Sequence, residues 1–172
     1  VAVKVQRPGI KKVIQSDLDI MYSIAGFSEQ HIESAELYRP TDIVDEFSKS
    51  INAEMDYVRE ATNIERFSNN LKDDPNIYVH NVYWKCCGDF VLTTEYIRGI
   101  KGDDFEKIDK YGFDRYKIAE VGGKSFMKQV FEDGVFHADA HSGNVMLMWD
   151  GRIALLDFGM VGYLPDYMRK GL

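Results

Sequence analysis

Hydrophobic residues recur along this chain with a spacing of three to four in some stretches and as short continuous runs in others. The helical spacing runs through residues 10–38, where we predict one or two helices, and through residues 114–132, where we predict another. It also starts at Pro40 and continues as one stripe to Leu71, which predicts a single long helix. This stripe consists of Val44, Phe47, Ile51, Met55, Val58, Phe67 and Leu71.

Shorter apolar runs bounded by turn signals predict strands. They cover residues 1–6, 77–84, 89–97, 144–148 and 153–156. Arg7-Pro8-Gly9 closes the first strand as a turn signal. Asp150-Gly151 separates the last two strands and is a dipeptide typical of hairpin turns, so these two strands are predicted to pair.

Composition excludes several classes of protein. The 172 residues are 45% hydrophobic, which is enough for a sizeable core and suggests one domain. The net charge is −7 and the basic residues are scattered, so no nucleic-acid partner is indicated. No apolar run approaches the roughly 18 residues of a membrane span. Cys86 and Cys87 are adjacent, which fits neither a disulfide framework nor a metal site.

Chemistry is concentrated near the end of the chain. Asp139 and Asn144 lie five positions apart in His137-Ala138-Asp139-Ala140-His141-Ser142-Gly143-Asn144, which is the offset of Asp and Asn in the catalytic loop of protein kinases. Asp157-Phe158-Gly159 follows thirteen positions after Asn144. The first residues, Val1-Ala2-Val3-Lys4, have the shape of the kinase strand that carries a phosphate-holding lysine. Order and spacing together predict the nucleotide site of a kinase-like fold.

Phosphoryl transfer depends on positioning and charge, so each residue type has a role in that site. Asn144 and Asp157 offer hard oxygen ligands to Mg²⁺, and Lys4 offers a cation to the α- and β-phosphates of ATP. Asp139 is the candidate base for the incoming hydroxyl. His141, when protonated, would counter the charge of the γ-phosphate; as an alternative, it packs in the loop and holds the catalytic backbone.

A kinase lysine needs an acidic partner on the following helix. Glu54, Asp56 and Glu60 are the candidates, and Asp56 and Glu60 share a helix face while Glu54 is turned away. One acid would pair with Lys4 and another would point elsewhere; the residues alone leave the choice open.

The predicted fold class is α+β, as a partial protein-kinase-like bilobal fold. Residues 1–98 are assigned to the first lobe, with a helical insert at 10–39, and residues 99–172 to the start of a helical second lobe. We expect the strands at 1–6, 77–84 and 89–97 to form one antiparallel sheet. Because strands and a glycine-rich loop would precede Lys4 in a kinase, the sequence is expected to be an excerpt of a longer protein.

The connection between the lobes is predicted near residues 95–99. Backbone groups of Glu95 and Ile97 are expected to hydrogen-bond adenine, and Thr94 is expected to guard the back of the pocket.

Several segments together resemble the UbiB/ADCK family of atypical kinases. They are Val1-Ala2-Val3-Lys4-Val5-Gln6-Arg7-Pro8-Gly9, Glu54-x-Asp56-Tyr57-x-x-Glu60-Ala61-x-Asn63, Phe136-His137-x-Asp139-x-His141-x-Gly143-Asn144 and Asp157-Phe158-Gly159. The resemblance covers essentially the whole chain. Its most specific parts are the E-x-D helix, the Q-R-P-G turn and the helical insert, because ordinary protein kinases lack them. The sequence departs from the family at Ala140 and Ser142, where the family usually has prolines.

The resemblance implies ATP and Mg²⁺ as cofactors and a role linked to ubiquinone or other isoprenoid lipid metabolism at membranes. It implies Glu60 as the partner of Lys4. It places Glu54 and Asp56 against an inhibitory K-x-G-Q segment outside this sequence. By resemblance, the protein would be membrane-associated in a bacterium, an archaeon, a mitochondrion or a plastid, through regions outside these residues.

Two alternatives remain. A small-molecule kinase of the aminoglycoside or choline kinase type also places a histidine two residues after the loop aspartate. Such an enzyme would not be expected to carry Glu54-x-Asp56 or Gln6-Arg7-Pro8-Gly9. The other alternative is a scaffold that binds a nucleotide without turnover. Filled metal and base positions argue against lost catalysis but do not establish turnover.

Overall fold

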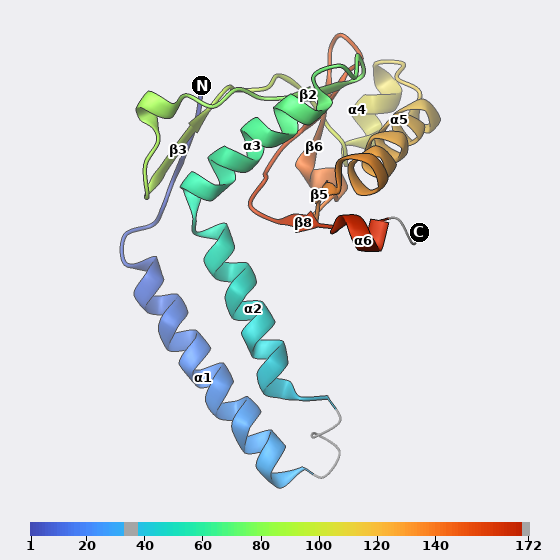
Figure 1. The fold of residues 1–172 in the computed structure, drawn as a ribbon. Helices are drawn as coiled ribbons and strands as arrows, with labels where there is room; N and C mark the ends of the chain where they lie inside the picture. Colours follow the sequence, from blue (N-terminus) through green and yellow to red (C-terminus); the bar gives the residue numbers. More distant parts are fainter. Residues whose placement is uncertain (33–37, 170–172) are drawn as a thin grey trace. The chain divides into compact units, whose positions relative to one another are not determined.

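The computed structural model describes residues 1–32 and 38–169, and it divides into two compact units (Figure 1). One unit contains Val1–Lys4 and the chain from Tyr57 onward, and the other contains Val5–Asp56. The predicted helical stretch at 10–38 includes residues 33–37, which lie outside the described residues.

The Val5–Asp56 unit is a pair of packed helices, α1 (Ile10–His31) and α2 (Pro40–Glu54). Its small core contains Leu18, Ala25 and Val44. Gly9 precedes α1 with a positive φ of 77°, a conformation that glycine adopts without a steric penalty. The turn predicted at Arg7-Pro8-Gly9 is present. Pro40 is the first residue of α2, a position where the missing N–H of proline costs no helical hydrogen bond.

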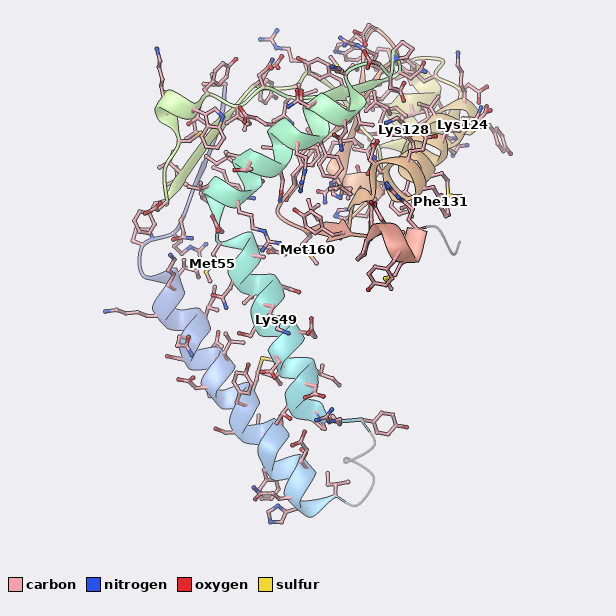
Figure 2. The ribbon with its side chains drawn as sticks, in the orientation of Figure 1. Lys49, Met55, Lys124, Lys128, Phe131 and Met160 are labelled. Atoms are coloured by element: carbon pink, nitrogen blue, oxygen red, sulfur yellow. The ribbon has the colours of Figure 1, made fainter. Side chains whose placement is uncertain are left out.

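The predicted single helix from Pro40 to Leu71 is wrong. α2 ends at Glu54, and a separate helix, α3 (Tyr57–Leu71), begins three residues later. Met55, labelled in Figure 2, lies at this junction, and its carbonyl accepts a hydrogen bond of 3.1 Å from Nε2 of Gln6. The acidic Glu54-x-Asp56 motif therefore lies at a break between helices.

Strands of the larger unit form three sheets. β1 (Ala2–Val5) pairs with β3 (Val91–Thr94), and β5 (Val135–His137) pairs antiparallel with β8 (Val161–Tyr163). A four-stranded sheet has the order β2 (Ile77–Val79), β7 (Ile153–Leu155), β6 (Val145–Met148) and β4 (Gly99–Lys101).

The predicted three-stranded antiparallel sheet is only partly correct. β1 joins β3, and the chain at 81–83 runs antiparallel to 93–95 through bonds from Tyr83 N to Thr93 O and from Glu95 N to Asn81 O, both 2.9 Å. However, β2 pairs in parallel with β7, and Trp84–Cys86 is a 3₁₀ turn rather than strand. The hairpin across Asp150-Gly151 is confirmed, since β6 and β7 pair antiparallel and Gly151 has a φ of 89°.

In the larger unit, α3 contacts the four-stranded sheet at β2, and α5 (Arg115–Lys128) contacts it at β7. The predicted helix at 114–132 is confirmed as α5, which continues into a π-helical turn, Gln129–Asp133. Asp114 caps its start by accepting from the N–H groups of Tyr116 and Lys117. Lys128, labelled in Figure 2, forms a 2.9 Å ion pair with Asp133. The shorter helices are α4 (Phe105–Lys110), α6 (Asp166–Arg169) and a 3₁₀ turn, Ser142–Asn144.

The main core lies under α3 and contains its apolar face. Phe67 and Phe158 are among its fully buried side chains, with Ile64. The remaining buried members are Tyr57, Ala61, Leu71, Ile77, Val79, Leu92, Val135 and Ile153. Among the described residues, none of the helices combines the length and the apolar character of a membrane span. The mixed α+β class is confirmed, and its core brings α3 against the Asp157-Phe158-Gly159 segment.

Candidate nucleotide site

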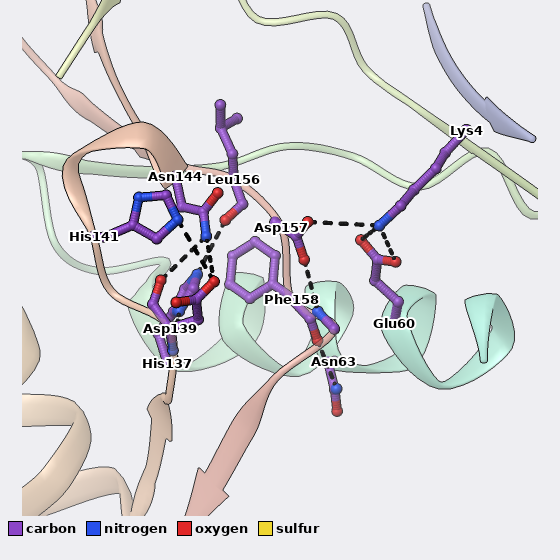
Figure 3. Close-up of polar contacts among 11 residues, drawn as sticks. Lys4, Glu60, Asn63, His137, Asp139, His141, Asn144, Leu156, Asp157 and Phe158 are labelled. Atoms are coloured by element: carbon purple, nitrogen blue, oxygen red, sulfur yellow. Dashed lines mark hydrogen bonds and ion pairs between the residues drawn. The ribbon is translucent and has the colours of Figure 1, made fainter. Parts of the chain in front are cut away.

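Lys4 on β1 lies between two acids that come from distant parts of the chain. Its Nζ is 2.9 Å from Oε2 and 3.2 Å from Oε1 of Glu60 on α3, and 3.5 Å from Oδ2 of Asp157 (Figure 3). Nζ also lies 5.4 Å from the ring centroid of Tyr57. The Glu60 side chain is 4% exposed, so the ion pair has one buried member and one at the surface of a cavity.

Burial and charge act against each other in this pair. Burial lowers the pKa of Lys4, but Glu60 and then Asp157 outweigh it, and the net pKa of Lys4 is raised. Burial raises the pKa of Glu60, and Lys4 offsets only part of that effect. Lys4 is therefore cationic across the ordinary pH range, as a phosphate-binding lysine must be.

Asp157 has an unusual backbone conformation. Its φ is 53°, in the left-handed region that non-glycine residues rarely occupy. Gly159 N donates to Asp157 Oδ1 over 3.1 Å. The ring of Phe158 packs against those of Phe67, His137 and His80, at centroid distances of 4.9, 5.4 and 5.8 Å. The buried phenyl ring thus anchors the segment that presents the Asp157 carboxylate.

His137 links the catalytic loop to the strand before Asp157. Its Nδ1 accepts from Asp139 N at 3.2 Å, so Nε2 carries the hydrogen and donates to Leu156 O at 3.0 Å (Figure 3). Gln129, in the π-helical turn, accepts from His137 N through Oε1 at 3.1 Å. No role for His137 was predicted from the sequence. Because both ring nitrogens of His137 are hydrogen-bonded, this residue connects the catalytic loop to the segment that precedes Asp157.

Asp139, His141 and Asn144 come together within the loop. Asn144 Nδ2 donates to the backbone oxygen of Asp139 at 3.1 Å and to Oδ2 at 3.0 Å. His141 Nε2 lies 3.6 Å from the same Oδ2, while its Nδ1 accepts from Gly143 N at 3.0 Å. A Cβ at Gly143 would lie 2.7 Å from the His141 ring, so a larger residue there would displace that ring from its present position.

The donor atoms fit a small hard cation. Because the nitrogen of the Asn144 amide is directed at Asp139, its oxygen is the atom available to a metal. Asp157 supplies a carboxylate, and the Leu156 N to Asn144 O bond of 2.8 Å ties the two segments together. An amide oxygen and a carboxylate suit Mg²⁺, which retains waters and phosphate oxygens as its other ligands.

A cavity of about 290 Å³ lies beside Lys4. Six residues assigned from sequence line it: Lys4, Glu60, Thr94, Glu95, Ile97 and Asp157. His80, Leu92, Tyr96, Met146 and Leu156 add mostly apolar lining. Asp139, His141 and Asn144 are not part of that lining; they lie in the loop that precedes β6. The cavity therefore combines an apolar wall with a cation and carboxylates at one end, which suits a base and its phosphates.

The Glu95 carboxylate is occupied by hydrogen bonds from Tyr78 and Asn81 and is therefore not assigned to base recognition. Its Oε2 accepts from Tyr78 Oη at 2.8 Å, from Asn81 Nδ2 at 2.8 Å and from Asn81 N at 3.2 Å. Burial raises the pKa of Glu95, but these donors outweigh it and the net pKa is lowered. Arg152 lies over the Tyr78 ring at 4.6 Å from its centroid. These contacts fix the chain at Glu95, and sequence patterns gave no sign of them.

Glu54 and Asp56 belong to the smaller unit. Glu54 is the last residue of α2, and Asp56 precedes α3; both are exposed. Their regulatory role remains a proposal.

Comparison with known proteins agrees with this geometry and defines a class, the atypical kinase-like proteins. The ABC1 atypical kinase-like domain matches residues 1–172, so the chain belongs to that family, which includes UbiB and ADCK proteins. It is 44% identical over 175 residues to ACTIVITY OF BC1 COMPLEX KINASE 1, chloroplastic, of Arabidopsis thaliana, covering 99% of this chain and 25% of the relative. It is 37% identical over 180 residues to a probable protein kinase UbiB of Pseudomonas fluorescens strain Pf0-1, covering all of this chain and 34% of the relative.

A solved structure shares the fold. It is the complex of Rv3197 with erythromycin from Mycobacterium tuberculosis, with a TM-score of 0.71 and 29% identity over 95% of this chain and 40% of that one. The kinase-like α+β fold is thereby confirmed. The chain spans about a quarter to a third of the length of the two curated relatives.

Proposed function

We propose that this chain contains the nucleotide site of an ATP- and Mg²⁺-dependent phosphotransferase or ATPase of the UbiB/ADCK type. The observation that supports it most is the position of Lys4 Nζ, 2.9 Å from Glu60 and 3.5 Å from Asp157 at the edge of a cavity of about 290 Å³. Kinase catalysis requires this lysine–acid pair and a metal-binding aspartate close together.

Each residue has a defined task in the proposed reaction. Lys4 holds the α- and β-phosphates, while Asn144 and Asp157 hold Mg²⁺ by oxygen atoms. The metal ion, when bound, neutralises charge on the phosphates. Asp139 accepts the proton of an acceptor hydroxyl or water, and the oxygen of that hydroxyl or water forms a bond to the γ-phosphorus. The bond between the γ-phosphorus and the oxygen that bridges it to the β-phosphate breaks, which releases ADP. Asn144 holds the Asp139 carboxylate in place through the 3.0 Å contact.

The base of ATP is assigned to the apolar part of the cavity. Backbone groups of Glu95 and Ile97 would bind adenine, with Thr94 at the back of the pocket. The side-chain bonds of Glu95 to Tyr78 and Asn81 support this, because they commit its carboxylate and fix its backbone. Residues 1–98 and 99–172 are proposed as parts of the two lobes of one kinase-like domain.

The metabolic assignment rests on family membership. The relatives include proteins named as probable UbiB kinases, and the family resemblance links them to ubiquinone or other isoprenoid lipid metabolism. Lipid or quinone-pathway components are accordingly proposed as partners, with membrane association through regions outside residues 1–172. Glu54 and Asp56 are proposed as a regulatory acidic motif.

Two measurements on the same sample distinguish this function from that of a scaffold that binds a nucleotide without turnover. ATP affinity, with and without Mg²⁺, and ADP release are measured on the full-length protein. We expect Mg²⁺-dependent binding and ADP release, both strongly weakened in Lys4→Met and retained in Lys124→Met, which changes an exposed lysine on α5. Binding without ADP release would leave a nucleotide-sensing scaffold, and binding unaffected by Lys4→Met would disprove the site.

A further inference from the structure

Asn63 is a buried polar residue on the core face of α3. It is 4% exposed, one helical turn after Glu60, and its neighbours on that face are apolar. Those neighbours are Tyr57, Ala61, Ile64, Phe67 and Leu71. An amide in such surroundings is costly to bury unless it is hydrogen-bonded. Its partner therefore identifies what the residue does.

That partner is the backbone of the Asp157-Phe158-Gly159 segment. Nδ2 of Asn63 donates to Phe158 O over 2.9 Å, across 95 positions of sequence (Figure 3). The Phe158 side chain is fully buried, so this carbonyl has no ready replacement for its donor. Losing one partner of a buried hydrogen bond leaves the other with its full desolvation penalty.

The same segment meets α3 a second time through Glu60. The backbone N–H of Phe158 acts on the Glu60 carboxylate and lowers its pKa against the larger effect of burial. Glu60, one turn before Asn63, thus lies near the same residue whose carbonyl Asn63 binds. The hydrogen bond from Asn63 restrains the peptide group between Phe158 and Gly159.

Such fixation matters because of Asp157. Its φ of 53° lies in the left-handed region, which costs a non-glycine residue free energy although aspartate tolerates it better than most. A rotation of the Phe158 peptide groups would change the direction of the Asp157 carboxylate, which lies 3.5 Å from Lys4. The ring of Phe158 is held by packing, and its carbonyl is held by Asn63.

We propose that Asn63 is a positioning residue that keeps Asp157 directed at the metal and at Lys4. It does so through its hydrogen bond to Phe158 O rather than by touching the nucleotide. This inference rests on the proposed nucleotide site. It adds that the α3 helix controls both ends of that site, Lys4 through Glu60 and Asp157 through Asn63.

The test uses Asn63→Leu, which keeps the approximate size and removes the donor, and Asn69→Leu, the same change at an exposed position of the same helix. Calorimetry measures binding of ATP with and without Mg²⁺ to the full-length proteins. We expect Asn63→Leu to weaken Mg²⁺-ATP binding about tenfold, the scale of one buried hydrogen bond, while metal-free ATP binding changes less than about twofold. Asn69→Leu should match the parent in both.

Hydrogen exchange gives a readout independent of nucleotide. Amides of residues 157–163 should exchange faster in Asn63→Leu than in the parent and in Asn69→Leu, at a temperature where all three are folded. Asn63→Ser, which is smaller and retains a polar atom, replaces Asn63→Leu if the latter does not fold, with the same expectations. Equal loss of ATP binding with and without Mg²⁺, or unchanged exchange and unchanged Mg²⁺-ATP affinity, would overturn the positioning role. A parent protein that binds no ATP would instead disprove the proposed function, and the exchange result would still decide whether Asn63 holds the segment.

Discussion

Nζ of Lys4 lies 2.9 Å from Oε2 of Glu60, although the two residues are 56 positions apart. Lys4 comes from β1 and Glu60 from the core face of α3, so the contact forms only when strand and helix are both in place. The Lys4 side chain is 42% exposed and Glu60 only 4%. The pair therefore orients a cation that still has one side open to a ligand.

Removing either member should weaken ATP binding through the same mechanism. Lys4→Met and Glu60→Gln should each raise the Kd for Mg²⁺-ATP by roughly tenfold to a hundredfold, the range of a hydrogen bond to a charged group. Because Glu60 acts by orienting Lys4, the double variant should bind no more weakly than Lys4→Met alone. Calorimetric titration of the four proteins in a double-mutant cycle measures this coupling.

Glu120→Gln is a suitable control, since Glu120 is exposed on α5 and pairs only with exposed Lys124 among the salt bridges of the described residues. It should leave the Kd unchanged. Additive losses in the cycle would mean that Glu60 contributes by a route other than Lys4.

Asp157→Asn should weaken the binding of ATP only when Mg²⁺ is present. The substitution keeps size and hydrogen bonding but removes the charge that attracts Mg²⁺. We expect the affinity for Mg²⁺-ATP to fall at least about tenfold, the equivalent of about 1.4 kcal/mol, with little change for metal-free ATP. Isothermal calorimetry with and without Mg²⁺ checks it.

Asp103→Asn, at an exposed position, provides the matched control and should behave as the parent. If Asp157→Asn bound Mg²⁺-ATP as tightly as the parent, its carboxylate would be only a turn-capping group for Gly159 N, the contact it makes at 3.1 Å.

The Asp150-Gly151 dipeptide predicted the β6–β7 hairpin and the apolar spacing predicted helical stretches, because those elements depend on local patterns. The apolar spacing could not predict the break at Met55. The apolar stripe is continuous there, and the break is accompanied by a tertiary contact from Gln6, 49 positions away. β2 was misplaced for a similar reason: nothing in Ile77–Val79 itself distinguishes a parallel partner in β7 from an antiparallel partner beside β1.

Motif spacing located the charged and polar residues of the site, since Asp139, Asn144 and Lys4 lie in recognisable local segments. The buried polar connections were beyond it. His137 and Asn63 were part of the quoted motifs, but their partners, Leu156 O and Phe158 O, are backbone atoms with no sequence signature. A polar residue interrupting the apolar face of α3 was the one available signal for Asn63.

Asp139→Asn should separate catalysis from binding. The asparagine keeps the size of the side chain and an oxygen acceptor for Asn144, but it is a much weaker base. We expect kcat for ADP release to fall by about 10²–10⁴-fold with the Kd for ATP largely unchanged. Single-turnover kinetics on the full-length protein measure the chemical step directly.

His141→Asn distinguishes the two roles of His141 in the same assay. If His141 acts on the γ-phosphate, its replacement should lower kcat. If His141 instead packs in the loop, where its ring accepts from Gly143 N, the replacement should mainly lower thermal stability.

Full turnover by Asp139→Asn would rule out the assignment of Asp139 as the base.

The Glu95 contacts should control affinity for the nucleotide rather than the chemical step. Tyr78→Phe removes the 2.8 Å bond to Glu95 Oε2 and keeps the ring under Arg152. Since a hydrogen bond to a charged group is worth about 1.5–3 kcal/mol at most, a partial loosening of the chain at Glu95 should raise KM for ATP several-fold. kcat should stay near the parent value, as the loop with Asp139 is untouched.

Tyr116→Phe makes the same change at a side chain that is 90% exposed and should alter neither constant. Steady-state kinetics with ATP varied give both values. A fall in kcat at unchanged KM for Tyr78→Phe would place its effect in the catalytic loop instead of the connection near residues 95–99.

His80 should make the stability of the fold depend on pH. Its side chain lies in the cavity lining, 6% exposed, and burial lowers the pKa of its imidazole below the usual 6.5, although Leu155 O, Glu95 and Asp157 partly oppose that shift. The unfolded chain therefore holds this proton more tightly than the folded protein does. Stability from this source is complete above about pH 6.5 and is lost as the pH falls below it.

His80→Gln should remove that dependence, so the melting temperature should decline less steeply between about pH 7.5 and 5.5 than that of the parent. Identical slopes for the parent and His80→Gln would show that the buried imidazole does not carry the pH dependence.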